Sequence, residues 1–119
     1  RTGDKIAVLR KTATVQDAVV EMTRVKAGSA CITDEAGKLV GIFTDGDLRR
    51  RFADGIDVLH NCICDVMTAN PVNVQEDALA VEVLRVFEKY KIDDLPVVDA
   101  TGRLAGYVDI QDLPRMKIL

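Results

Sequence analysis

The feature that most constrains the fold of this 119-residue chain is an internal repeat. Displacing the sequence by 65 residues aligns positions 12–48 with positions 77–113 without a gap, and eight positions are then identical. The identical pairs are Ala13/Ala78, Lys26/Lys91, Asp34/Asp99, Gly37/Gly102, Leu39/Leu104, Gly41/Gly106, Asp47/Asp112 and Leu48/Leu113. Most of them lie in the second half of the aligned segments, where turns and strand ends need particular residues. The chain is therefore predicted to contain two similar structural units.

Each unit has one segment whose apolar residues recur at helical spacing. In unit one these residues are Val15, Ala18, Val19, Met22 and Val25. In unit two they are Ala80, Val83, Leu84 and Phe87, at the corresponding positions. Apolar residues at this spacing form one stripe of an amphipathic helix. Thr14 is the expected N-cap of the first helix, because its hydroxyl can accept a hydrogen bond from a free amide of the first turn.

A predicted β-hairpin follows each of these helices. Its two apolar runs cover residues 30–33 and 39–43 in unit one, and residues 95–98 and 104–108 in unit two. The turns between them are Asp34–Gly37 and Asp99–Gly102, whose Asp and Gly residues are typical of tight turns. A second helix is expected from Asp45, carrying Leu48 and Phe52, whereas its counterpart after Asp109 is limited by Pro114.

The predicted fold is α+β, with a β-α-β-β-α repeat in residues 1–58 and a second in residues 59–119. The first strand of each repeat is expected near Ile6–Leu9 and Val72–Val74. The connector 57–70 is predicted to form a short helix with a flanking loop. One unit alone buries little core at this length. We therefore expect the two small sheets to pack through their helices into one body with pseudo-two-fold symmetry.

Composition excludes several function classes. The chain has 16 Lys+Arg against 19 Asp+Glu, a net charge of −3, so nothing attracts it to nucleic acid or to an anionic membrane. No apolar run approaches the roughly 20 residues that span a bilayer, and a cytoplasmic location is expected. The three cysteines fit no disulfide framework, which agrees with a reducing compartment. Because the sequence starts at Arg1, we expect it to be part of a longer protein.

The segment Leu39–Leu48, Leu-Val-Gly-Ile-Phe-Thr-Asp-Gly-Asp-Leu, closes the first unit with a recognisable pattern. Together with Leu95–Asp99, Leu104–Val108 and the entry segment Asp65–Thr68, it resembles the tandem cystathionine-β-synthase (CBS) domain pair, also called a Bateman module. The resemblance covers nearly the whole chain. It implies two repeats around a shared cleft that takes nucleotide-type ligands, and self-association into homodimers.

A narrower resemblance rests on Gly41–Arg50, Gly-Ile-Phe-Thr-Asp-Gly-Asp-Leu-Arg-Arg. This string resembles the CBS pair of bacterial D-arabinose-5-phosphate isomerases of the sugar-isomerase type, which serve Kdo and lipopolysaccharide synthesis. Those enzymes carry the pair after a catalytic domain that no segment of this chain matches. The resemblance therefore implies a regulatory region whose parent is an isomerase. It also implies a tetrameric parent and no catalytic residues in this fragment.

Thr44 and Asp47 are the leading candidates for ligand contacts. The family motif implies that Thr44 donates to a phosphate oxygen and that Asp47 accepts ribose hydroxyls, and the amides of a helix N-terminus favour an anion. The alternative is that Thr44 or Asp45 caps the helix and Asp47 stabilises its first turn. In unit two Asp109 replaces the threonine and would repel a phosphate, although Asp112 remains. One competent anionic site, on unit one, is predicted.

The other candidate site residues surround this motif. Arg49, Arg50 and Arg51 are consecutive on a helix and therefore point in different directions. They either form a solvated basic face, or at least one of them turns to the cleft and pairs with a phosphate or carboxylate. Lys91 and Ser29, at helix-to-strand junctions, are candidates for the cleft wall. Cys31 opens a buried strand and is expected to be core filler whose backbone could contact a base.

No metal site and no cofactor are predicted. The spacing of His60, Cys62 and Cys64 does not match structural zinc sites, which need four ligands. In the segment Asp45–Arg50, apolar and cationic residues stand where a calcium loop needs oxygen ligands. The sequence shows no nucleophile beside an evident base, so a catalytic role has no positive support.

Two functions from different classes remain. The leading prediction is a sensor that binds cytidine-monophosphate-Kdo (CMP-Kdo) or an adenine nucleotide, AMP or ATP, and biases an attached isomerase. The alternative is an assembly module that dimerises through its apolar helices without a ligand.

Overall fold

The computed structural model describes residues 6–111. The first repeat consists of β1 (Ala7–Arg10), α1 (Val15–Val25), β2 (Ser29–Thr33), β3 (Leu39–Thr44) and α2 (Asp45–Phe52). The second consists of β5 (Val74–Gln75), α4 (Ala80–Tyr90), β6 (Asp94–Val98) and β7 (Leu104–Asp109). The 3-10 helix η2 (Ile56–His60), α3 (Ile63–Val66) and β4 (Thr68–Ala69) connect them. The order β-α-β-β-α is confirmed for the first repeat, and the closing helix of the second lies outside the described residues.

The two sheets share one topology. In the first sheet, ordered β1-β2-β3-β4, β1 runs parallel to β2 and β2 runs antiparallel to β3. In the second, ordered β5-β6-β7, β5 runs parallel to β6 and β6 runs antiparallel to β7. The first sheet has an additional strand because β4 pairs with β3. This shared topology is the structural form of the repeat seen in the sequence.

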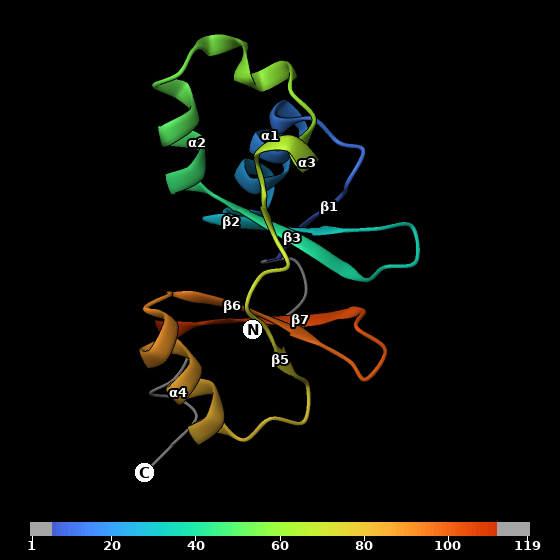
Figure 1. The fold of residues 1–119 in the computed structure, drawn as a ribbon, viewed down its shortest axis with the longest axis vertical. Coiled ribbons are helices and arrows are strands. Elements are labelled where there is room, and N and C mark those ends of the chain that lie inside the picture. The colour runs from blue at the N-terminus through green and yellow to red at the C-terminus, as the bar shows by residue number, and fades with distance from the viewer. Residues whose placement is uncertain (1–5, 112–119) are drawn as a thin grey trace.

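The sheets face each other at the centre of the molecule, with α1, α2 and α3 beyond one sheet and α4 beyond the other (Figure 1). The expectation that the sheets pack through their helices is therefore wrong. Strand β2 explains the difference, because it is buried at every position and so needs cover on both faces. Helix α1 covers one face, and the second sheet covers the face that carries Cys31.

The two repeats are related by pseudo-two-fold symmetry at their hairpin turns. The amide of Leu39 donates to the carbonyl of Gly102 at 3.1 Å, and the amide of Leu104 donates to the carbonyl of Gly37 at 3.1 Å. Both glycines adopt positive φ, +85° at Gly37 and +89° at Gly102, which a residue with a side chain rarely adopts. The predicted Asp-x-x-Gly hairpin turns are thereby confirmed.

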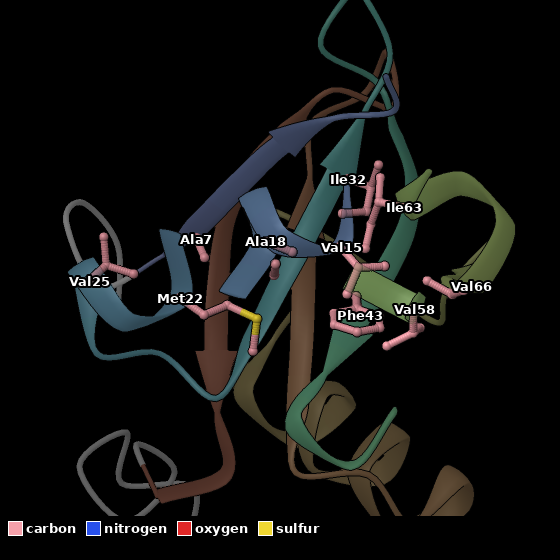
Figure 2. Packing of buried hydrophobic residues seen from close by; sticks show 11 residues of the cluster. Ala7, Val15, Ala18, Met22, Val25, Ile32, Phe43, Val58, Ile63 and Val66 are labelled. Atoms are coloured by element: carbon pink, nitrogen blue, oxygen red, sulfur yellow. The ribbon is translucent and has the colours of Figure 1, made fainter. Parts of the chain in front are cut away.

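A separate apolar core lies on the helix side of each sheet. Figure 2 shows the first, in which Val15, Ala18 and Met22 of α1 pack with Ile32 and Phe43 of the sheet. The second is smaller: Val83 and Phe87 of α4 pack against Val74 and Leu95. These helix residues belong to the stripes predicted from apolar spacing. Among the described residues, no helix is long and apolar enough to cross a membrane.

The connector belongs largely to the first core, although it leads into the second repeat. Ile63 and Val66 of α3 are buried there with Val58 (Figure 2). Met67, the residue after α3, presses against Gly41 of β3 so closely that a Cβ at position 41 would collide with its side chain. A larger residue at this position of the Leu-x-Gly pattern would therefore have to displace the Met67 side chain.

Candidate functional site

A cleft of about 610 Å³ lies where the two repeats meet. One wall is formed by the end of β3 and the start of α2, with Thr44, Asp45, Gly46 and Asp47. The opposite wall comes from the α4–β6 junction, and its residues are Lys91, Ile92, Asp93, Asp94 and Pro96. Thr68 of β4, which pairs with Ile42 of β3, and the following Pro71 and Val72 complete the lining. Both repeats are needed to form this cleft.

Thr44 and Asp47 line the cleft and also cap α2. The Thr44 hydroxyl accepts a hydrogen bond from the amide of Asp47 at 3.1 Å, and the Asp47 carboxylate accepts one from the amide of Thr44 at 3.0 Å. This reciprocal pair is a capping box. The structural role foreseen for these residues is thus real, and it coexists with a position on the cleft wall. The hydroxyl proton of Thr44 can still be donated, because accepting one hydrogen bond does not use it.

Arg50 lies one turn further along α2 and also lines the cleft. Its guanidinium donates to Asp47 and forms an ion pair with it, while the Arg50 side chain stays 72% exposed. A second hollow of about 440 Å³ adjoins the cleft and shares Asp47, Arg50 and Thr68 with it. Arg51 lines this second hollow. Two arginines are therefore available to a ligand that extends out of the cleft along α2.

The far wall places charges opposite this motif. Lys91 ends α4 in the left-handed conformation, with φ of +54°, and Asp93 and Asp94 follow it. Burial raises the pKa of Asp94, repulsion from Asp109 and Asp93 raises it further, and a hydrogen bond with Tyr107 opposes the shift. Taken together, the cleft lining carries four carboxylates and two cationic side chains.

The pseudo-equivalent position in the other half of the interface is occupied by a side chain. Ile42, which lines the cleft, corresponds in the repeat to Tyr107, and the Tyr107 hydroxyl forms a hydrogen bond with Ser29 across the two sheets. Burial also raises the pKa of Tyr107, so its hydroxyl stays protonated and can donate. Asp109 stands where the first unit has Thr44. The two halves of the interface are therefore chemically different.

The structure separates the remaining candidate residues into three groups. Arg50 and Lys91 lie on the cleft wall with Thr44 and Asp47. Ser29 is buried and forms a hydrogen bond with Tyr107. Cys31 is fully buried between the sheets, and the loss of hydration there raises the pKa of its thiol to about 12. Arg49 is exposed on α2 and does not line the cleft. Asp112 lies outside the described residues.

Sequence reasoning missed much of the far wall. Asp93 and Asp94 are displaced by 65 residues from Gly28 and Ser29, so the repeat itself places them at the matching junction. Thr68 lies in the connector, and Pro71 and Val72 lie between the connector and β5. No period in the sequence of this stretch places it at the cleft. Tyr107 could have been noticed because it is a bulky residue at the position of Ile42.

No cluster of three or more potential metal ligands exists among residues 6–111. Cys62 and Cys64 are neighbours, but His60 does not join them in such a group.

Comparison with known families identifies the class of protein. The CBS domain family matches residues 3–54 and again residues 63–115. The chain belongs to the CBS domain family, and with two copies it is a CBS domain pair. Solved CBS proteins share the fold: the pair of protein MJ0100, solved with 5′-methylthioadenosine and S-adenosyl-L-methionine, has a TM-score of 0.82 at 28% identity and covers 97% of this chain and 90% of its own.

CBSX2 from Arabidopsis thaliana, solved in complex with AMP, has a TM-score of 0.80 at 25% identity, with 96% of this chain and 88% of that one covered. Among curated proteins, arabinose 5-phosphate isomerase KdsD of Escherichia coli is 41% identical over 118 residues, which is 99% of this chain and 36% of the isomerase. KdsD of Pseudomonas aeruginosa is 46% identical over 102 residues, 86% of this chain and 31% of the isomerase. The chain thus spans about a third of the length of these relatives.

Proposed function

We propose that this CBS pair is the regulatory region of an arabinose-5-phosphate isomerase and that its cleft binds a nucleotide-type metabolite. The observation that carries the proposal is the convergence of Thr44, Asp47 and Arg50 from one repeat with Lys91 from the other on a single cleft. Hydroxyl, carboxylate and guanidinium groups suit phosphate and ribose hydroxyls. The identity with KdsD supports the isomerase as parent, and the ligands of solved CBS pairs support a nucleotide.

The charges in the cleft narrow the ligand class. Four carboxylates and two cationic side chains line it, so a highly charged triphosphate meets net repulsion. A ligand with few negative charges and many hydroxyls fits better, because carboxylates accept hydrogen bonds from hydroxyl groups. CMP-Kdo and AMP satisfy this condition better than ATP. CMP-Kdo also carries a sugar carboxylate that Arg51 in the adjoining hollow can meet, and it is the preferred ligand.

One site per chain is expected. At the pseudo-equivalent position Tyr107 and Ser29 bond to each other, and Asp109 replaces the threonine hydroxyl with a carboxylate. A phosphate there would face Asp109 and Asp94 together. The Tyr107–Ser29 position thus links the two sheets, whereas the cleft at Thr44 binds the ligand.

Regulation requires that the ligand bind one arrangement of the parent protein more tightly than another, because equal affinity shifts no equilibrium. An end product of the Kdo pathway that inhibits its first committed isomerase would act in this way. The chain itself supplies the binding energy, and the isomerase reaction belongs to the part of the parent that this chain does not match. An isomerase assay on the chain alone is expected to give no turnover.

Calorimetric titration of the chain with AMP, ATP, CMP and CMP-Kdo tests the proposal. We expect heat from CMP-Kdo with one site per chain, weaker binding of AMP, and the weakest binding of ATP. CMP separates the contribution of the nucleotide from that of the sugar. Absence of heat with all four compounds would defeat the sensor.

The second candidate is an assembly module without a ligand, and exposed apolar side chains favour it. Val20 lies on α1 and is 60% exposed, and Leu79 lies directly before α4 and is 66% exposed. Homodimers through these faces, and a tetrameric parent, are compatible with either function. Light scattering of the chain and of Val20→Glu measures association, while titration measures ligand. An assembly module predicts dimers that show no heat with any nucleotide.

A further inference from the structure

Two cysteines of the connector lie close enough for direct chemistry. The Sγ atoms of Cys62 and Cys64 are 2.7 Å apart, which is about 0.7 Å longer than the ~2.0 Å bond of a disulfide. Both are free thiols, Cys62 half-buried and Cys64 exposed. The cleft lies elsewhere, and neither cysteine lines it. The pair therefore needs an explanation separate from ligand binding.

The fold fixes the backbone between these two cysteines. Ile63, between the two cysteines, is fully buried in the first core beside Val15 and Ile32 (Figure 2). Its amide donates to the carbonyl of Ala13 at 2.8 Å. The Cys62 thiol donates to the carbonyl of Lys11 at 3.2 Å. With the intervening residue fixed in the core, the two sulfur atoms stay on the outside of α3 and close to each other.

The third cysteine provides a contrast within the same chain. Cys31 is buried between the sheets, and burial raises the pKa of its thiol to about 12. A reagent therefore cannot readily reach this thiol in the folded chain. The pKa of Cys64 is raised as well, to about 11, chiefly by its hydrogen bond with Cys62. The pair thus differs from Cys31 in its exposure and in the closeness of its two sulfur atoms, while in both places the thiolate is the reactive species. Oxidation of the folded chain should then select the exposed pair.

We propose that Cys62 and Cys64 form a reversible intramolecular disulfide by exchange with a low-molecular-weight disulfide such as oxidised glutathione. The exposed Cys64, as thiolate, attacks one sulfur of glutathione disulfide, expels one glutathione thiolate and forms a mixed disulfide. The Cys62 thiolate then attacks the Cys64 sulfur and expels the second glutathione. The two electrons and the two thiol protons of the cysteines end on two glutathione molecules, and the reverse exchange restores the dithiol.

A measurable consequence distinguishes this site from any Cys-x-Cys sequence. An unfolded chain can also close the same small ring, but there the two thiols meet only by chance. In the folded chain α3 holds them together, so folding should favour the disulfide. By the thermodynamic cycle that links folding and oxidation, the disulfide then stabilises the fold by the same factor.

The experiment equilibrates the chain in glutathione redox buffers of known ratio, with and without urea, quenches with acid and alkylates the remaining thiols. After trypsin digestion, Cys62 and Cys64 lie together in the peptide 52–85 and Cys31 lies in the peptide 27–38. The disulfide appears in the first peptide as the loss of two hydrogen atoms and of both alkyl groups. We expect the equilibrium constant for its formation to be at least tenfold larger in the folded chain, which corresponds to about 1.4 kcal/mol.

Three variants make the result specific. Cys31→Ser is expected to leave the equilibrium unchanged, whereas Cys62→Ser and Cys64→Ser stop at the mixed disulfide with glutathione. Equal or smaller constants in the folded chain would refute the proposal, as would covalent dimers through Cys64 in place of the internal bond. A folded chain in which Cys31 is oxidised before the pair would also refute it. Circular dichroism of each variant confirms that the comparison is made on folded protein.

Discussion

The capping box at Thr44 has a counterpart that separates binding from stability. Thr14 and Asp17 form the same reciprocal pair at the start of α1, with hydrogen bonds of 3.1 and 2.9 Å, away from the cleft lining. Removing either threonine hydroxyl leaves a first-turn amide without its partner. Thr14→Ala and Thr44→Ala are therefore expected to lower the free energy of unfolding by a similar amount, about 1 kcal/mol each.

Only Thr44→Ala should affect the ligand. A hydrogen bond to a charged group is worth about 1.5–3 kcal/mol, so losing the Thr44 hydroxyl should raise the dissociation constant of CMP-Kdo roughly 10-fold to 150-fold. Thr44→Ser keeps the hydroxyl and should retain both stability and affinity. Urea unfolding of the variants measures the first quantity, and calorimetric titration measures the second.

The matched pair also defines what would refute this reasoning. If Thr14→Ala weakens binding as much as Thr44→Ala does, the loss reflects general destabilisation and Thr44 is only a helix cap. If Thr44→Ala binds as tightly as the unaltered chain, the hydroxyl makes no contact with the ligand. The cleft would then have to recognise its ligand through other groups.

Three further outcomes follow from the same structure. Tyr107→Phe leaves the buried Ser29 hydroxyl without its partner and should lower the free energy of unfolding in urea by about 1–3 kcal/mol. Adding Ser29→Ala should lower it by a smaller further amount, and fully additive losses would contradict the hydrogen bond between Tyr107 and Ser29. The pKa of Asp94 is raised in the fold, so the stability that its protonated carboxyl contributes is lost as pH rises above the ordinary aspartate range. Asn does not titrate, so the free energy of unfolding of Asp94→Asn should increase relative to that of the unaltered chain between about pH 4 and pH 7. Parallel pH profiles of the two proteins would refute this. Gly41→Ala should lower the free energy of unfolding by roughly 1–3 kcal/mol, because its Cβ collides with Met67. In a chain that also carries Met67→Ala, the same substitution should cost less. An unchanged cost would show that another contact excludes the Cβ.

The repeat and its elements were predictable because they depend on local chemistry. Apolar spacing located α1 and α4, and the Asp-x-x-Gly turns located both hairpins. The capping role of Thr14 follows from its side chain and its place before an apolar stripe. Each of these features needs only neighbours in the sequence.

The stacking of the two sheets was harder to foresee because it depends on cover for a second face. In strand β2, Ser29, Cys31 and Thr33 are buried on the side away from α1. The strand therefore lacks the alternation of buried and exposed residues, which indicates that its second face is also covered. A continuous buried run is ambiguous between cover by a helix and cover by a sheet. Only the partner surface, which includes Pro96 and Tyr107, resolves the choice.

The candidate site was half predictable for the same reason. Thr44 and Asp47 were found by their motif and Lys91 by its place at a helix-to-strand junction, but residues 68–72 of the lining belong to a stretch with no sequence period. Arg50 illustrates the limit: three consecutive arginines point in three directions, and the sequence does not say which one faces the cleft. Its ion pair with Asp47 sets that direction in the structure.

The double role of the capping box bears on how a bound ligand could be sensed. Thr44 and Asp47 are already held in place by each other, so a ligand that contacts them does not have to order them first. The same contacts define the first turn of α2 and orient Arg50 through Asp47. Under the proposed function, a ligand that bonds to this group and to the far wall would bias the position of α2 relative to the second repeat, because both repeats line the cleft. Under the proposed function, the difference in affinity that regulation requires would arise from this relative position.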